Sequence, residues 1–170
     1  MKPTRKPNRL KDYDYSEDGA YFLTICTQEK KQTLSHIPHS GDGALPPTPH
    51  LTKIGEIVRT AIAAIPEHYP GVFVDRFVIM PNHVHLLVRI ERGGRLISAP
   101  TGADRPSVAN VIRQLKRYVT KCAGTCVWQK GFYDHIIRDE QDYLTRARYI
   151  ENNPAKWAED DYNHGTTGDY

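Results

Sequence analysis

Two histidines separated by a single residue carry the strongest chemical signal in the sequence. His83 and His85 open an apolar run, His83 to Ile90, that is typical of a strand. Residues two apart on a strand point to the same face, so both imidazoles are expected on one side of a sheet. Imidazole is a common metal ligand, and two adjacent rings need a cation or hydrogen bonds to satisfy their nitrogens. The pattern predicts a metal site that needs a third ligand. The alternatives are a solvated face, or one ring hydrogen-bonded in the core and the other exposed.

A tyrosine and an asparagine near the end of the chain are suited to complete such a site. Tyr149 and Asn153 are four residues apart on an expected helix, which stacks them on one face. The amide oxygen can join the two histidines while the phenol lies beside the ion. Tyrosine is a useful nucleophile only where a positive field or a base favours the phenolate. Its attack on a phosphodiester would leave a phosphotyrosine link and a free 3′-hydroxyl.

Both residues also have ordinary structural interpretations. The chain holds ten tyrosines, most of which must serve packing. Asn153 precedes Pro154, a pair that is typical of a helix end. Position alone therefore does not single out either residue.

Hydrophobic periodicity and turn residues predict the elements that would position these groups. Strands are expected at residues 20–27, 72–80, 83–90 and 132–137. The first helix is expected at residues 54–65. The second begins after the N-cap Ser107 and extends through Lys121, and the third begins after the cap Asp139 and extends towards Asn153. Residues 28–50 and 91–106 are rich in Gly, Ser and Pro and are expected to be loops, with Pro66 and Pro70 ending the first helix.

This order of elements predicts an α+β fold. Two βαβ halves commonly form the ferredoxin-like split arrangement, an antiparallel sheet with helices on one face. Here an extra C-terminal helix follows and carries Tyr149. We expect a basic arm at residues 1–18, one domain at residues 19–160 and a tail at residues 161–170.

Composition narrows the class of protein. The 170 residues are 39% hydrophobic, which suits a single globular domain without a membrane span. The basic start has no apolar core and does not resemble a secretory signal. Cys26, Cys122 and Cys126 are too few for a disulfide framework, and no second pair completes a zinc site with the last two. A cytoplasmic location is expected.

Four blocks of the sequence resemble the REP-associated tyrosine transposases and related single-tyrosine HUH transposases. The blocks are Tyr21 to Thr27, Met80 to Val88, Trp128 to His135, and Tyr149 to Lys156. They follow the family's order and extend over nearly the whole chain. The resemblance implies that His83 and His85 are metal ligands, that Asn153 is the third ligand and that Tyr149 is the nucleophile. His135 lies in a matching block, and packing or outer-shell support of the site is expected for it.

The resemblance also implies a substrate, single-stranded DNA folded into imperfect hairpins, which is cut and rejoined through a 5′-phosphotyrosine intermediate. The donor set suits Mg²⁺ or Mn²⁺. Relatives act either as monomers or as homodimers that exchange nucleophile helices. With a formal charge of +3, the protein has cations suited to track phosphates. The expected DNA-binding residues are Arg113, Lys116, Arg117, Lys121, Lys130 and Arg138, although each taken singly is more typical of a solvated surface.

Two other functions fit parts of this pattern. A non-catalytic module that binds single-stranded nucleic acid is the main alternative, because ferredoxin-like sheets commonly hold single strands. Such a module would have no use for the two histidines and Asn153. A hydrolase of small phosphoesters would use bound water as its nucleophile and would not need Tyr149.

Overall fold

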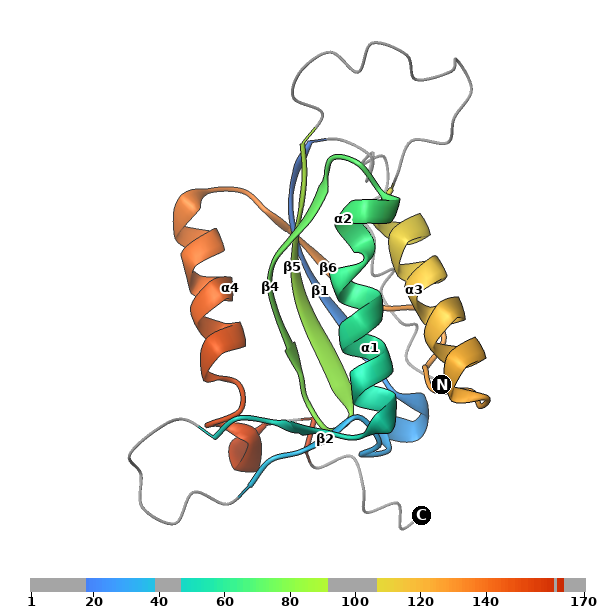
Figure 1. Cartoon of the computed structure of the whole chain (residues 1–170). Helices are drawn as coiled ribbons and strands as arrows, with labels where there is room; N and C mark the ends of the chain where they lie inside the picture. The colour runs from blue at the N-terminus through green and yellow to red at the C-terminus, as the bar shows by residue number, and fades with distance from the viewer. Residues whose placement is uncertain (1–17, 39–46, 92–106, 161, 164–170) are drawn as a thin grey trace, which may run out of the picture.

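A four-stranded antiparallel sheet organises the structure, as Figure 1 shows. The computed structural model describes residues 18–38, 47–91, 107–160 and 162–163, so almost all of the expected basic arm and of the second long loop lies outside the described residues. The strands are β1 (Gly19–Cys26), β4 (Val72–Ile79), β5 (His83–Ile90) and β6 (Tyr133–Ile137). Their order is β4-β5-β1-β6, which confirms the ferredoxin-like prediction.

The two central strands have helices on both faces. β1 pairs antiparallel with β5 along its full length, Gly19 opposite Ile90 and Cys26 opposite His83. β1 contains aromatic and β-branched residues and β5 is rich in Val and Leu; five of the eight residues of β1 and seven of the eight of β5 are buried. The rigid centre of the sheet therefore includes the histidine pair.

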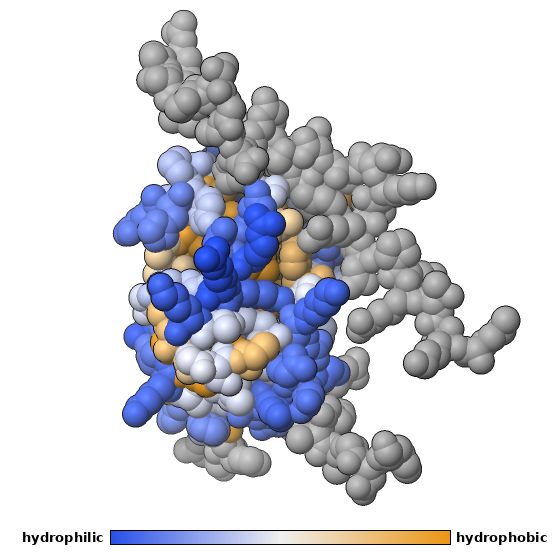
Figure 2. Space-filling model, turned by 90° about the vertical axis from the view of Figure 1, so that its right-hand side faces the viewer, coloured by the Kyte–Doolittle hydropathy of each residue, from blue (hydrophilic) through white to orange (hydrophobic). Residues whose placement is uncertain are grey.

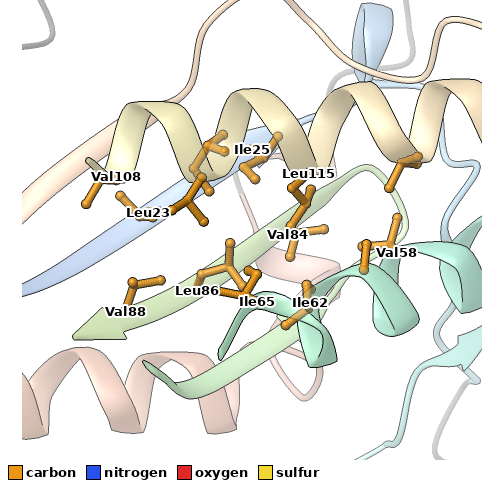
Figure 3. Close-up of a cluster of buried hydrophobic side chains, with 14 of the residues drawn as sticks. Leu23, Ile25, Val58, Ile62, Ile65, Val84, Leu86, Val88, Val108 and Leu115 are labelled. Carbon is orange, nitrogen blue, oxygen red and sulfur yellow. The ribbon is translucent and has the colours of Figure 1, made fainter. Parts of the chain in front are cut away.

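Helices α1 (Lys53–Ala63) and α3 (Val108–Ala123) cover one face of the sheet. Thr52 and Ser107 cap them, accepting from the backbone N–H groups of Gly55 and Asn110. The larger apolar core lies between these helices and the sheet, and Figure 3 shows side chains from both layers meeting there. Labelled members are Leu23, Ile25, Val84, Leu86 and Val88 from the sheet, with Val58, Ile62, Ile65, Val108 and Leu115 from the helices.

The first helix ends differently from the prediction. Pro66 was expected to stop it, but α1 ends at Ala63 and a short helix, α2 (Ile65–His68), follows. Pro66 lies in the first turn of α2, where the missing N–H costs no hydrogen bond. The proline therefore starts a turn of helix instead of ending one.

Helix α4 (Glu140–Asn152) packs on the opposite face of the sheet from α1 and α3 (Figure 1). Asp139 caps it, with a 2.8 Å hydrogen bond from the Asp142 amide, as predicted. A second, smaller apolar cluster lies beneath the helix and contains Phe22, Leu87 and Ile150. The extra C-terminal helix thus has a core of its own on the face that carries the histidines.

The first expected loop contains some regular structure. A 3₁₀ turn, η1 (Gln28–Lys30), follows β1, and the short strands β2 (Ser35–His36) and β3 (His50–Leu51) pair antiparallel. Gly55 permits this ladder to approach α1, because a β-carbon there would collide with the carbonyl oxygen of Leu34. A final 3₁₀ turn, η2 (Trp157–Glu159), follows α4.

Figure 2 shows that the face formed by α1 and α3 is largely hydrophilic. In the described part of the chain, every helix is too short or too polar to cross a bilayer.

Candidate active site

The histidine pair lies at the start of β5, in the middle of the sheet and on the side that faces α4. Alternation along the strand sends Val84 and Leu86 into the larger core and leaves His83 and His85 on the opposite side. The ring centroids of the two histidines are 4.5 Å apart, and both side chains are fully buried. This is the shared face that the sequence predicted.

Hydrogen bonds orient the His83 ring. Its Nδ1 lies 2.9 Å from Oδ1 of Asn82. The Asn82 amide nitrogen donates to the backbone carbonyls of Lys30 and Tyr162, so the amide orientation is fixed and Oδ1 must accept. The proton of His83 is therefore on Nδ1, and Nε2 presents a lone pair.

Thr24 on the neighbouring strand plays a similar part for His85. Its hydroxyl oxygen lies 2.8 Å from Nδ1 of His85, and the two residues are direct partners in the β1–β5 register. The ring of His85 also stacks on Phe22, with centroids 5.1 Å apart. Both rings are thus held by their Nδ1 side, the outer-shell arrangement usual for metal-binding histidines.

Three buried polar atoms remain without a hydrogen-bond partner at this point of the structure. They are Nε2 of His83, Nε2 of His85 and Oδ1 of Asn153. Leaving such atoms unsatisfied costs free energy, and all three are lone-pair donors suited to a cation. Within the described residues no three His, Cys, Asp or Glu side chains form a metal-binding group, so an amide oxygen is the third donor on offer. The residues therefore fit a divalent ion.

Burial keeps both imidazoles neutral. It lowers the pKa of His83 to about 4, although the Asp160 carboxylate and the Asn153 amide act in the opposite direction. Burial and the neighbouring His83 hold the pKa of His85 well below its usual value. Neutral imidazoles are the form that binds metals.

Tyr149 lies over the same face, one helical turn before Asn153. Its ring centroid is 5.2 Å from that of His85 and 5.9 Å from that of Phe22. The side chain is 40% exposed, in contrast to the buried histidines. A pocket of about 510 Å³ opens beside it, and its lining includes Arg148, Asn153 and Lys156. The site thus combines a buried donor set with an accessible phenol.

An irregularity in β4 fixes α4 to the sheet. The β4–β5 register shifts between Val74 and Arg76, leaving Asp75 as an extra residue. Asp75 accepts a 2.9 Å hydrogen bond from the Tyr143 hydroxyl on α4 and is paired through two bonds with Arg89 on β5. This network holds the helix that carries Tyr149 in register with the histidines.

His135 supports the other side of α4. Its Nε2 lies 2.7 Å from Asp142, which also pairs with Arg146 at 3.3 Å. The Arg146 guanidinium lies 5.3 Å above the ring of Phe22, the same ring that contacts Tyr149. His135 therefore contacts α4 through Asp142, and its outer-shell role stays a prediction.

A second tyrosine, which the sequence did not single out, covers the histidines. The ring of Tyr162 lies 4.4 Å from that of His83, and Trp157 is 6.0 Å away. Burial raises the pKa of Tyr162 to about 12. Tyr162 falls in the predicted tail, whose residues 161 and 164–170 lie outside the described residues.

The predicted DNA-binding residues are not gathered around this site. Arg113, Arg117 and Lys121 are exposed on α3, on the far face of the sheet. Lys116 donates to the carbonyls of Gln129 and Gly131 and so holds the loop before β6. Lys130 and Arg138 are exposed at the two ends of β6. Nucleic-acid contact by these residues stays a prediction.

Thr24, Asn82 and Asp160 are the site residues that sequence reasoning missed. Thr24 and Asn82 lie in two of the blocks that resemble the family, but neither was predicted to have a role at the site. The position of Asn82 directly before the His83 motif was the one available signal. The partners of Thr24 and Asp160 depend on strand register and on the path of the chain after α4.

Comparison with known proteins places these residues within a described family. The family model for IS200-like transposases matches residues 50–153, a segment that contains His83, His85, Tyr149 and Asn153. An uncharacterized protein of Haemophilus influenzae is 34% identical and covers 92% of this chain and 91% of its own. The REP-associated tyrosine transposase of Escherichia coli K12 is 24% identical, covering 84% of this chain and 70% of its own.

A solved structure shares the fold. It is that of a REP-associated tyrosine transposase bound to a REP hairpin, with a TM-score of 0.62 and 22% identity. The match covers 88% of this chain and 74% of the other.

Proposed function

The chain belongs to the IS200-like transposase family, and we propose that it cuts and rejoins single-stranded, hairpin-forming DNA with Tyr149 as the nucleophile. The observation that carries this proposal is the convergence of three unpartnered donor atoms, on His83, His85 and Asn153, beside an exposed tyrosine. A module that only binds nucleic acid has no need of such a donor set. A hydrolase has no need of the phenol.

The donor atoms would hold Mg²⁺ or Mn²⁺. His83 offers an Nε2 lone pair because the oxygen of Asn82 accepts its Nδ1 proton, and His85 offers one in the tautomer whose Nδ1–H donates to the Thr24 hydroxyl. Asn153 offers an oxygen, which hard divalent ions prefer. When bound there, such an ion would polarise the scissile phosphate and screen the charge that develops on its oxygens.

The proposed reaction conserves the phosphodiester's energy. The Tyr149 oxygen loses its proton and bonds to phosphorus while the P–O3′ bond breaks, giving a 5′-phosphotyrosine and a 3′-hydroxyl after protonation. In the second step a 3′-hydroxyl of another end attacks the same phosphorus, the bond between phosphorus and the Tyr149 oxygen breaks, and the hydroxyl proton returns to Tyr149. Neither water nor ATP is consumed. The chemistry therefore suits strand transfer.

The pocket beside Tyr149 is the proposed path of the strand. Arg148 and Lys156 line it and would pair with phosphates on either side of the reacting one. A hairpin substrate is proposed because a structural relative is bound to a REP hairpin. All of the site's donor groups and the phenol come from one chain, which supports a monomer as the acting unit.

The three cysteines are free thiols, which agrees with a reducing compartment. We propose that the protein acts in the cytoplasm, at the nucleoid when bound to DNA.

Covalent capture of DNA tests the proposal. The protein is incubated with Mn²⁺ and a panel of imperfect hairpins with single-stranded flanks, labelled at either the 5′ or the 3′ end. Because the phosphotyrosine keeps the 3′ part of the strand, we expect the 3′ label on a protein-sized band in a denaturing gel. The 5′ label is expected on a shorter free fragment. Fully duplex DNA of the same sequences and EDTA-treated samples are the controls.

Two results would contradict the proposal. Cleavage that leaves both labels on free fragments, without an adduct at any time, would show water as the nucleophile and favour a hydrolase. Binding of the hairpins without cleavage across the panel would favour the non-catalytic module.

A further inference from the structure

The side-chain amide of Asn153 is hydrogen-bonded through its nitrogen but not through its oxygen. Its nitrogen Nδ2 donates a 3.1 Å hydrogen bond to Oδ2 of Asp160, whereas Oδ1 is buried without a hydrogen-bond partner. An amide can rotate by half a turn and exchange these two ends at almost no steric cost. With nitrogen turned towards the histidines, the side chain would offer them N–H donors and could not bind a cation. The contact with Asp160 excludes that orientation.

We infer that Asp160 is a positioning residue of the metal site, because its carboxylate fixes the Asn153 amide with the oxygen directed to the ion. The inference rests on the proposed function. It adds to the metal site a residue that lies outside both the His83–His85 pair and helix α4. Asp160 follows η2, outside the segment that matches the family model.

Asp160 acts through Asn153 and not as a ligand. Its two carboxylate oxygens are already engaged, Oδ2 by Asn153 and Oδ1 by the backbone N–H of Tyr162 at 2.9 Å. Among the described residues it forms no three-membered metal-binding group with the two histidines. Accepting a hydrogen bond from the amide nitrogen also makes the amide oxygen a stronger donor to a cation.

The charge of Asp160 adds to this effect. Two neutral imidazoles and an amide carry no negative charge, so a nearby carboxylate is the compensation available to a divalent ion. The charge of Asp160 is close to the site, since its carboxylate is hydrogen-bonded to the Asn153 amide that offers the third donor atom. Its position does not depend on an ion, because its N–H donates to the Trp157 carbonyl and its own carbonyl accepts from Asn163.

Mn²⁺ affinity of the full-length, DNA-free protein tests the inference, measured by the loss of the free-ion signal in electron paramagnetic resonance. Asp160→Asn keeps the shape but leaves one amide nitrogen facing either Asn153 or the Tyr162 N–H, both of which are donors. We expect affinity to fall by about 10- to 100-fold, the usual cost of losing an outer-shell partner. Glu159→Gln removes an equal charge from the adjacent residue and is expected to change affinity by less than about threefold.

A second variant separates positioning from a purely structural contact. Asn153→Asp places a carboxylate at the ligand position, and a carboxylate has oxygens at both ends and needs no orienting partner. In that background Asp160→Asn should leave Mn²⁺ affinity unchanged or raise it, because a like-charge contact is relieved. Thermal unfolding of each variant is measured in parallel.

The outcomes are distinguishable. Wild-type affinity in Asp160→Asn, or an equal loss of affinity in both backgrounds, would overturn the inference and leave the proposed function standing. If the parent protein binds Mn²⁺ no better than His83→Ala does, the proposed metal site, and with it the proposed function, would be contradicted.

Discussion

Replacing Tyr149 with Phe should abolish the covalent adduct and lower the rate of DNA cleavage by at least about a thousandfold. The substitution removes only the hydroxyl, so the ring contacts with His85 and Phe22 can persist. Without the attacking oxygen, only the residual rate acceleration from binding and electrostatics remains. The rate is measured as release of the 5′-labelled fragment under single-turnover conditions. Hairpin affinity, measured by anisotropy, should change little.

Tyr118→Phe is the matched control. Tyr118 is 48% exposed on α3, on the other side of the sheet, and the loss of its hydroxyl should leave cleavage within about twofold. Cleavage by Tyr149→Phe at a rate close to the parent's would show that another group attacks the phosphate.

Replacing either His83 or His85 with Ala should abolish tight Mn²⁺ binding and lower cleavage by about a hundredfold or more. Each variant loses one of the buried Nε2 atoms that have no hydrogen-bond partner. A bound divalent ion stabilises the transition state by several kcal/mol, and each 1.4 kcal/mol corresponds to about a factor of ten in rate. Cleavage is compared at saturating and at limiting Mn²⁺, and far-ultraviolet circular dichroism checks the fold.

His68→Ala is the matched histidine control for metal binding. His68 is exposed in α2, which lies with α1 on the other face of the sheet, so Mn²⁺ affinity should remain within about threefold of the parent's. Removal of the ion by EDTA should reproduce the effect of the His83 and His85 variants in the parent protein. Undiminished cleavage in His83→Ala, His85→Ala and the EDTA-treated parent would contradict a metal-dependent mechanism.

Local sequence patterns predicted most of the fold because the spacing of apolar residues reflects which side chains are buried. β5 is found at the predicted residues, since every second side chain had to enter the larger core. Ser107 and Asp139 begin their helices because an N-cap is a local hydrogen bond. Pro66 was misinterpreted because a proline ends one helix and starts another equally well. The short β2–β3 ladder was missed because two-residue strands have no periodicity.

The candidate site, like the fold, was predicted from the sequence only where local spacing determines it. His83 and His85, two apart on a strand, and Tyr149 and Asn153, four apart on a helix, share faces that spacing alone predicts. Whether those two faces meet depends on which side of the sheet α4 covers, and that follows from the packing of Ile150 on α4 with Phe22 and Leu87 of the sheet. The partners Thr24 and Asp160 reach the site through strand register and through a turn after the helix. Neither contact produces a regular spacing of residues in the sequence, so neither could be predicted from it.

Tyr149 is the residue proposed to attack the DNA, and the site contains a second tyrosine against which this assignment is tested. The ring centroid of Tyr162 lies 4.4 Å from that of His83, and Tyr162 lines the same pocket as Tyr149. The covalent adduct should be trapped on a hairpin substrate, digested with nuclease and protease, and mapped by tandem mass spectrometry. We predict that the nucleotide remnant is attached to Tyr149 and to no other tyrosine. A remnant on Tyr162 would contradict the claim and assign the nucleophile to the segment after η2.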